Sequence, residues 1–256
     1  MKKAVRPLKS LYFIWVLLLS GCASVYHLAD EQVQTYRITE KTVDVADHSP
    51  IEEMIAPYRR QLTEEMDQVI GFVASDLEKG NPESSLGNFV TDAVLAEAQK
   101  ITDLNYDFSI CNIGGIRISS IAAGPINKGK IYELMPFDNY LVTMKVPGEV
   151  IGKLFDSMAQ VGGWPISHGV TFQIKDQRAQ NIMINGQPFD PQQTYSFVLS
   201  DYLAEGGGDL TFLKDYPYQN LGVYYRDALI EYVTLKNKNS EKIEAEIEGR
   251  VINLDL

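Results

Sequence analysis

Histidine and cysteine are scarce in this chain of 256 residues, which contains only His27, His48, His168, Cys22 and Cys111. Transition-metal centres take most of their ligands from these two residue types, so the composition offers little material for such a centre. Positive charge is scarce as well, with 23 Lys and Arg against 34 Asp and Glu and a formal charge of −11. Because affinity for nucleic acid comes mostly from clustered lysines and arginines, the charge balance argues against a nucleic-acid-binding protein.

A short apolar run near the N-terminus, from Leu11 to Leu19, follows several positively charged residues. Nine apolar residues are too few to span the roughly 30 Å of a bilayer's hydrocarbon core, so the run predicts a signal segment and not a membrane-spanning helix. It ends in Leu19-Ser20-Gly21-Cys22, which resembles the lipobox of bacterial lipoproteins. An ordinary secretory signal that contains a cysteine by chance is the alternative.

The lipobox resemblance implies that residues 1–21 are a signal peptide and that Cys22 becomes the lipidated N-terminus. Several acyl chains together give stable attachment to a membrane. The next residue is Ala23, and not the aspartate that retains lipoproteins in the inner membrane of enteric bacteria. We therefore expect a lipoprotein of the cell envelope, held in the outer membrane and facing the periplasm or the cell surface. Cys111 is then the one other thiol, and we expect it to be buried and inert.

The rest of the sequence predicts a single α/β domain in which helices pack on a mixed sheet. Residues 22–48 are polar and weakly patterned, which indicates a lipidated tether and an entering segment before a domain at 49–256. No internal repeat or inter-domain linker interrupts that domain.

Hydrophobic periodicity predicts the elements of the domain. Apolar residues at helical spacing predict helices near 51–66, 85–100, 150–158 and 226–236. Pro57 should kink the first helix, and Glu97 interrupts the apolar face of the second, so we expect its last turn to be exposed. Alternating or short apolar runs predict strands near 69–74, 107–111, 140–146, 170–174, 182–184, 195–199 and 247–252, of which 140–146 should be half-exposed.

Three predicted loops next to strands carry unusual residues, at positions where open α/β sheets present their ligand loops. In the first, 112–117, paired glycines permit positive φ and close approach of a ligand to the backbone, and Arg117 offers a planar fork for phosphate or carboxylate. The second, 135–139, places Phe137 between a proline and two turn-forming residues. The third, 201–209, places Tyr202 ahead of three glycines. Taken singly, each has a structural alternative: a simple turn, a core-filling phenylalanine and a flexible loop.

Taken together, the loops resemble a known family. Asn-x-Gly-Gly-Ile-Arg from residue 112, Pro-Phe-Asp-Asn from residue 136 and Asp-Tyr-Leu-Ala-x-Gly-Gly from residue 201 follow the order of motifs in the C-terminal domain of bacterial and animal 5′-nucleotidases. Glu-Ser-Ser-Leu-Gly-Asn from residue 83 resembles that domain's opening motif. The likeness is collinear over nearly the whole chain after the tether.

The resemblance implies a domain that binds the nucleoside part of a nucleotide. Phe137 and Tyr202 match the two aromatics that clamp the base, and stacking on such rings stabilises a bound base by roughly 1–3 kcal/mol per contact. The segment that contacts the ribose and phosphate end corresponds to Asn112, Gly114, Gly115 and Arg117. Arginine suits that end because it donates two parallel charge-assisted hydrogen bonds.

Asn88 matches a position that lines the same cleft in part of the family. Family members usually read Gly-Gly-Asp-Gly after the second aromatic, and the Asp meets the ribose hydroxyls. Here Gly208 stands at that position, and Asp209 follows one residue late. The segment before Asn88 also lacks an arginine that some members carry. These departures keep open a third interpretation, an interaction protein with a degenerate cleft.

Hydrolysis in this family uses a two-metal centre in a separate N-terminal domain of the metallophosphoesterase type, and its histidine-rich motifs are missing from this sequence. We therefore expect no catalytic residues, no metal site and no cofactor here, and no activity for the chain alone. The resemblance implies that the chain supplies nucleotide binding to a separate metallophosphoesterase protein in extracytoplasmic nucleotide catabolism. A lipoprotein that only captures nucleosides or nucleotides is the alternative.

Overall fold

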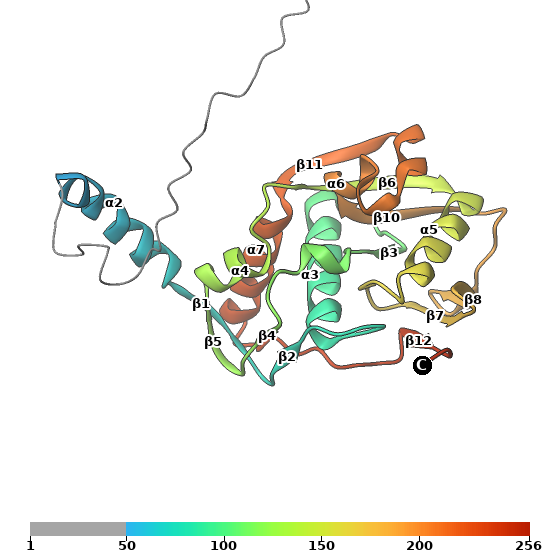
Figure 1. Ribbon diagram of the computed structural model, residues 1–256, viewed down its shortest axis with the longest axis horizontal. Helices are drawn as coiled ribbons and strands as arrows, with labels where there is room; N and C mark the ends of the chain where they lie inside the picture. Colours follow the sequence, from blue (N-terminus) through green and yellow to red (C-terminus); the bar gives the residue numbers. More distant parts are fainter. Residues whose placement is uncertain (1–49) are drawn as a thin grey trace, which may run out of the picture. The chain divides into compact units, whose positions relative to one another are not determined.

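The computed structural model describes residues 50–256 (Figure 1). The predicted signal peptide, the predicted lipidation site Cys22, the predicted tether, His27 and His48 lie outside the described residues. The helices are α2 (Pro50–Met66), α3 (Ser85–Thr102), α4 (Lys128–Leu134), α5 (Gly148–Gln160), α6 (Asp201–Ala204) and α7 (Tyr225–Lys238). The strands are β1 (Val69–Val73), β2 (Leu77–Glu78), β3 (Phe108–Ser109), β4 (Ser120–Ile121), β5 (Gly124–Asn127), β6 (Tyr140–Pro147), β7 (Val170–Lys175), β8 (Arg178–Ile184), β9 (Gln187–Pro188), β10 (Thr194–Ser200), β11 (Tyr218–Tyr224) and β12 (Val251–Asn253). Short 3-10 turns lie at Ile113–Gly115, Gly207–Asp209 and Thr211–Asp215.

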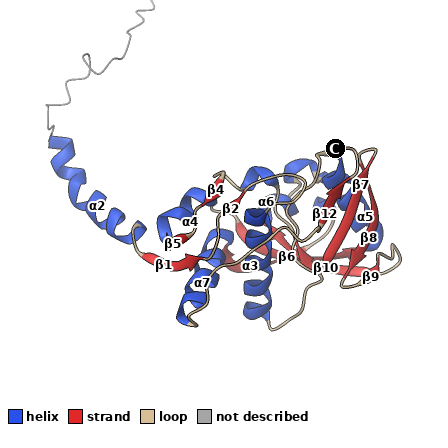
Figure 2. Cartoon of the chain, turned by 90° about the horizontal axis from the view of Figure 1, so that it is seen from below, coloured by secondary structure: helices blue, strands red, loops and turns tan. Residues whose placement is uncertain are grey.

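Two four-stranded sheets dominate the compact unit that residues 53–256 form. The first has the order β11-β6-β10-β3, with β6 antiparallel to both neighbours and β3 parallel to β10. The second has the order β12-β7-β8-β9 and also mixes parallel with antiparallel pairing. Figure 2 shows α3, α5 and α7 packed against these strands. The predicted mixed α/β class is therefore confirmed.

The first sheet lies between two apolar cores, because successive side chains of a strand point to opposite faces. Val142 and Leu199 belong to the core that α5 covers, whereas Leu141 and Val198 belong to the core that α3 and α7 cover. The strand predicted at 140–146 is confirmed as β6, but the expectation that it is half-exposed is wrong for this reason. Both faces of β6 are covered, and residues 141–144 are all buried.

Helix α3 lies in the core that it shares with α7. Ser84 caps its N-terminus by accepting a hydrogen bond from the Gly87 amide at 3.1 Å, as the Ser-Ser-Leu-Gly sequence favours. The last turn of α3 is more exposed than the rest of the helix, as predicted, with Lys100 and Ile101 at the surface, but Glu97 itself is only 3% exposed. Lys100 covers it with a contact of 3.3 Å and also bridges to Glu231 of α7. Burial raises the pKa of Glu97, although the bond from Lys100 opposes the shift.

Helix α2 is continuous through Pro57, so the expected kink does not divide it. Its apolar stripe faces outward, with Met54, Tyr58 and Leu62 all more than half exposed. The elements that had no sequence prediction are α4, α6, β2, β4, β5, β9 and β11. Within residues 50–256, no helix combines the length and the apolar character needed to cross a membrane.

Candidate functional site

The three loops singled out in the sequence leave one end of the first sheet. Strand β10 runs parallel to β3, with Val198 beside Ser109, so the loops that follow both strands emerge together. Strand β6 runs antiparallel to β10, with Leu141 beside Ser200, so the segment that precedes β6 lies at the same end. The strand pairing therefore brings 112–117, 136–139 and 201–209 to one end of the first sheet, which forms their shared edge.

A fourth segment joins them. Strand β11 is antiparallel to β6, with Tyr224 beside Tyr140, so the junction of β11 and α7 reaches this same end. The rings of Tyr224 and Tyr140 stack with their centroids 4.8 Å apart. Sequence reasoning missed this segment because β11 reads Tyr-Gln-Asn-Leu-Gly-Val-Tyr, which does not alternate and contains a glycine.

Arg117 and Phe137 form a cation–π pair. The guanidinium carbon of Arg117 lies over the phenyl ring, 5.9 Å from its centroid. The Arg117 amide donates to the Leu134 carbonyl at 2.9 Å, which ties the first loop to the helix that precedes Phe137. Phe137 is 36% exposed and belongs to neither core, so the core-filling alternative for this residue is wrong. An exposed ring beside an exposed arginine can stack on a base and meet a phosphate together.

The paired glycines of the first loop are needed for close packing. They lie in a 3-10 turn, and neither takes the positive φ that glycine permits. A Cβ on Gly115 would stand 3.1 Å from Asn112 Oδ1, and one on Gly114 would stand 3.3 Å from Asn112 Nδ2. The Gly115 amide donates to the Asn112 carbonyl at 2.9 Å. The turn thus wraps around the Asn112 side chain, which is only partly buried.

The Tyr202 side chain packs against the glycines that follow it, at 206–208. Its ring packs flat against Gly207, where an added Cβ would come within 2.4 Å of the ring, and its hydroxyl accepts from the Gly208 amide at 3.3 Å. Gly206 and Gly208 have φ of 85° and 63°, so the three glycines are required for two reasons, backbone conformation and ring contact. Tyr202 is 48% exposed and presents one face outward.

Asp209 is exposed and follows Gly208 with a positive φ of 65°. Two consecutive left-handed residues turn the loop sharply, and Trp164 packs against Gly208 from inside, where a Cβ would meet the indole at 2.7 Å. The loop end therefore has a fixed course, with its carboxylate one position beyond that of the family pattern.

A family model for the 5′-nucleotidase C-terminal domain matches residues 64–215. The chain belongs to this family. Protein UshA of Escherichia coli K12 is 25% identical over 197 residues, which cover 75% of this chain and 36% of UshA. The 5′-nucleotidase of Vibrio cholerae is 23% identical over 202 residues, covering 75% of this chain and 35% of the relative. The chain thus spans about a third of the length of the curated relatives it matches.

Solved structures show the same fold. The 5′-nucleotidase precursor from Thermus thermophilus superposes with a TM-score of 0.67 at 28% identity, covering 80% of this chain and 43% of that one. The NAD nucleotidase of Haemophilus influenzae gives a TM-score of 0.61 at 18% identity, covering 79% of this chain and 40% of that one. The predicted resemblance to the 5′-nucleotidase C-terminal domain is therefore confirmed.

Asn88, which the family resemblance placed in the cleft, has its side chain inside the domain. It is 1% exposed, and its amide nitrogen donates to Glu83 Oε1 and to the Glu246 carbonyl, both at 2.7 Å. Glu83 also accepts from the Glu248 and Arg250 amides at 2.8 Å. With both amide hydrogens engaged, Asn88 fastens the C-terminal segment to α3 and has no donor left for a ligand.

The histidine of the described chain, His168, pairs with a carboxylate. Its Nδ1 lies 3.1 Å from Asp92 Oδ1, and its amide donates to the same oxygen at 2.8 Å. The bond to Asp92 raises the pKa of His168 despite an opposing effect of burial. Burial alone would raise the pKa of Asp92, but the bonds from His168 and Arg250 outweigh it and leave that pKa lowered. In residues 50–256, no three His, Cys, Asp or Glu side chains gather as a metal ion would need.

Cys111 lies directly before the first loop and is buried, as predicted. Burial raises the pKa of its thiol to about 12, which leaves the sulfur protonated and unreactive at neutral pH. The cysteine therefore belongs to the packing beneath the loop, where its Sγ would lie 3.2 Å from a Cβ on Gly115.

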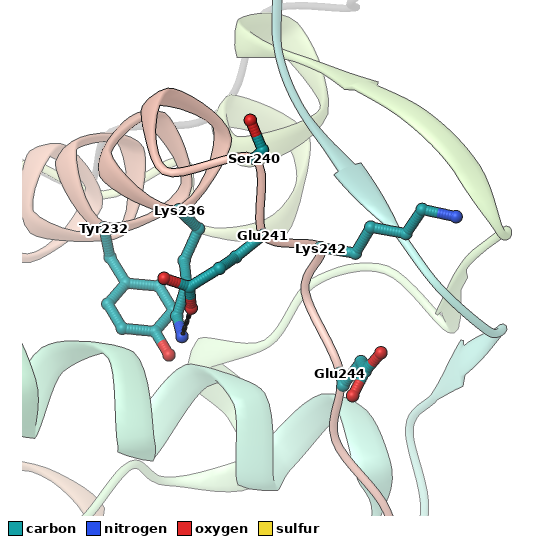
Figure 3. Close-up of a pocket in the computed structure, with 6 residues that line it drawn as sticks. All are labelled: Tyr232, Lys236, Ser240, Glu241, Lys242 and Glu244. Atoms are coloured by element: carbon teal, nitrogen blue, oxygen red, sulfur yellow. Dashed lines mark hydrogen bonds and ion pairs between the residues drawn. The ribbon is translucent and has the colours of Figure 1, made fainter.

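A separate hollow of about 680 Å³ lies at the C-terminal end of α7 (Figure 3). It is lined by Tyr232, Lys236, Ser240, Glu241, Lys242 and Glu244. Lys236 extends along the Tyr232 ring and bonds Glu241 at 2.5 Å, as the dashed line shows. Two lysines and two glutamates cancel in charge, so we assign no ligand to this hollow.

Proposed function

We propose that this domain binds the nucleoside part of a nucleotide at the shared edge formed by the loops 112–117, 136–139 and 201–209. The observation that carries the proposal is the contact of Arg117 with the exposed ring of Phe137, on a loop adjacent to that of Tyr202. Two exposed aromatic rings can hold a base, and the arginine beside one of them can hold phosphate. Asn112, Gly114 and Gly115 supply the turn on which the ribose and phosphate end would rest.

The proposal extends to a catalytic partner. The chain covers about a third of its relatives, and the matching family model is that of a C-terminal domain. We propose that a separate metallophosphoesterase protein holds the divalent metals and hydrolyses the nucleotide, while this chain contributes substrate binding. The chain itself then needs no cofactor and has no catalytic residue.

The site of action in this proposal is the cell envelope. Lipid on Cys22 would anchor the chain in the outer membrane, facing the periplasm or the surface. A Cys22→Ser variant should lose lipid labelling and remain in the soluble fraction. Retention on membranes after a high-salt wash would mean that something other than lipid holds the protein.

Calorimetric titration with adenosine and AMP tests the binding proposal directly. We expect both to bind the purified chain, with AMP tighter because it adds a phosphate. A colorimetric phosphate assay with AMP and Mn²⁺ should show no release by the chain alone. Absence of binding to either compound in a well-folded sample would refute the nucleotide-binding proposal. It would favour the interaction protein with a degenerate cleft, whose displaced Asp209 is the feature that supports it.

A further inference from the structure

Arg226 reaches back from the first turn of α7 to the segment that carries Phe137. Its Nη2 bonds Asp138 Oδ1 at 2.8 Å, and its Nη1 donates to the Phe137 carbonyl at 3.4 Å. The neighbouring Tyr225 amide donates to the Asn139 carbonyl at 2.8 Å. Three successive residues of the loop are thus held by two successive residues of the helix, although they are nearly ninety positions apart in sequence.

Aromatic rings fix the guanidinium of Arg226. Its central carbon lies 4.2 Å from the ring centroid of Tyr132 and 5.9 Å from that of Tyr224. Tyr224 in turn stacks on Tyr140, the first residue of β6. A planar guanidinium can stack on a ring and donate in its own plane at once, which an ammonium group cannot do. The rings that surround this guanidinium therefore favour arginine over lysine at position 226.

The burial of this arginine requires an explanation. The side chain is only 9% exposed, and Nε is buried without a hydrogen-bond partner. A buried donor that lacks a partner lowers stability, so packing alone would favour an apolar residue at this position. The side chain is also too deeply buried to meet a ligand in the way the exposed Arg117 can. What its bonds do achieve is to order the backbone on both sides of the Phe137 ring.

We propose that Arg226 is the positioning residue for Phe137, holding that ring ready to stack on the base of a bound nucleoside. This inference rests on the proposed function, and it adds a residue that does not touch the ligand. An ordered ring loses less conformational freedom on binding than a mobile one, so a pre-positioned Phe137 binds more tightly. The effect of Arg226 should pass through Phe137 and leave the phosphate end unchanged.

A double-mutant cycle tests the inference, with adenosine and AMP affinities measured by calorimetry on the full chain. The variants are Arg226→Gln, Phe137→Ala and the two combined, with Arg178→Gln as the matched control. Arg178 is a surface arginine that also pairs with a carboxylate, that of Asp156. We expect Arg226→Gln to weaken adenosine and AMP equally, by on the order of tenfold, and the double variant to bind no more weakly than Phe137→Ala. The control should bind as the wild type does.

Hydrogen exchange in the absence of ligand gives a second measurement that does not depend on binding. The Tyr225 amide, which donates to the Asn139 carbonyl at 2.8 Å, should exchange at least several-fold faster in Arg226→Gln than in the wild type, while the amides of β10 stay unchanged. Asp138→Asn removes only the exposed end of the ion pair, and it provides a milder variant if Arg226→Gln does not fold. It should shift exchange and affinity in the same directions by smaller factors.

The outcomes separate the two proposals. If wild type binds adenosine but Arg226→Gln binds it equally well, or if the double variant shows additive losses, the positioning role is wrong and the proposed function stands. If wild type binds neither compound, the proposed function is wrong. Unchanged exchange of the Tyr225 amide would overturn the positioning role whether or not the chain binds a nucleoside.

Discussion

Arg250 forms a bidentate ion pair with Asp92. Its Nη1 donates to Oδ1 at 2.8 Å and its Nη2 donates to Oδ2 at 2.7 Å. The two residues are 158 positions apart, so this pair fastens the C-terminal segment to α3. The Arg250 side chain is 4% exposed, and it also donates to the Ile166 carbonyl at 2.9 Å and bonds Glu248. The hydrogen bonds of Arg250, Glu83 and Asn88 together hold the segment that precedes β12 against the N-terminal half of α3.

Removing the charge of Asp92 should destabilise the domain. Asp92→Asn leaves the buried guanidinium of Arg250 with a weaker partner, and we expect a loss on the order of 3 kcal/mol in the free energy of unfolding. Denaturant titration measures it. The matched control is Glu133→Gln, which breaks an exposed pair with Lys130 and should cost about 0.5 kcal/mol or less. Equal effects of the two variants would contradict the structural role given to Asp92.

The His168–Asp92 pair should make stability depend on pH. The pKa of His168 is raised above its usual value of 6.5, so its contribution is complete below about 6.5 and is lost as pH rises through the folded-state pKa. The pKa of Asp92 is lowered, so its contribution holds above its usual 3.8 and is lost as pH falls through the folded-state value. The stability difference between wild type and His168→Gln should therefore be complete below about pH 6.5 and shrink as pH rises above it, through the raised folded-state pKa of His168. Thermal melts at a series of pH values test it, and a difference that grows with pH would contradict the assigned bond.

Phe137→Ala should weaken binding and leave the fold stable. Loss of one stacking face should reduce adenosine affinity by roughly 1–3 kcal/mol, or about 5- to 150-fold. Because the ring is 36% exposed and contacts the Arg117 side chain, stability should fall by no more than about 1 kcal/mol. Calorimetry and melting on the same sample separate the effects. Unchanged affinity in a folded variant would remove Phe137 from the proposed clamp.

Gly207→Ala should be destabilising because of the Tyr202 ring. The new Cβ would lie 2.4 Å from that ring, and such overpacking costs about 1–3 kcal/mol. Removing the ring relieves the clash, so Gly207→Ala combined with Tyr202→Ala should be no less stable than Tyr202→Ala alone. Tyr202→Phe keeps the ring and loses only the 3.3 Å bond to the Gly208 amide, so its stability should change by about 0.5 kcal/mol. Additive losses in the double variant would show that Gly207 is required for another reason.

Arg117→Ala should discriminate between AMP and adenosine. If the exposed guanidinium meets the phosphate, AMP should lose roughly 1.5–3 kcal/mol of binding free energy while adenosine loses much less. Competition titrations with both compounds measure the ratio. Lys130→Ala, which removes another surface charge, should leave the ratio unchanged. Equal weakening of AMP and adenosine would assign Arg117 to holding Phe137 and not to phosphate.

Local patterns in the sequence predicted the family, the mixed α/β class and most elements of the domain. Helix α3 and strands β7 and β10 lie where their apolar periodicity places them, since the face that a residue occupies follows from spacing along the chain. The loops around Arg117, Phe137 and Tyr202 could be singled out because glycine and proline mark turns next to strands. At 201–209 the sequence predicted only a loop with a tyrosine ahead of three glycines. The structure alone shows why glycine is needed there, since Gly206 and Gly208 take positive φ and the Tyr202 ring lies on Gly207.

Only the tertiary structure decided which distant residues meet. Glu97 is buried because α7 packs along α3, and Asn88 faces inward because the C-terminal segment folds back over the start of that helix. Strand β11 pairs through its backbone with β6, which its own side chains do not predict, and that pairing delivers Arg226 to the Phe137 loop. These contacts join residues tens to more than a hundred positions apart, and their free energy depends on the packing of whole elements. Periodicity describes one element at a time, so the sequence determined the parts of the candidate site and the packing decided what holds them in place.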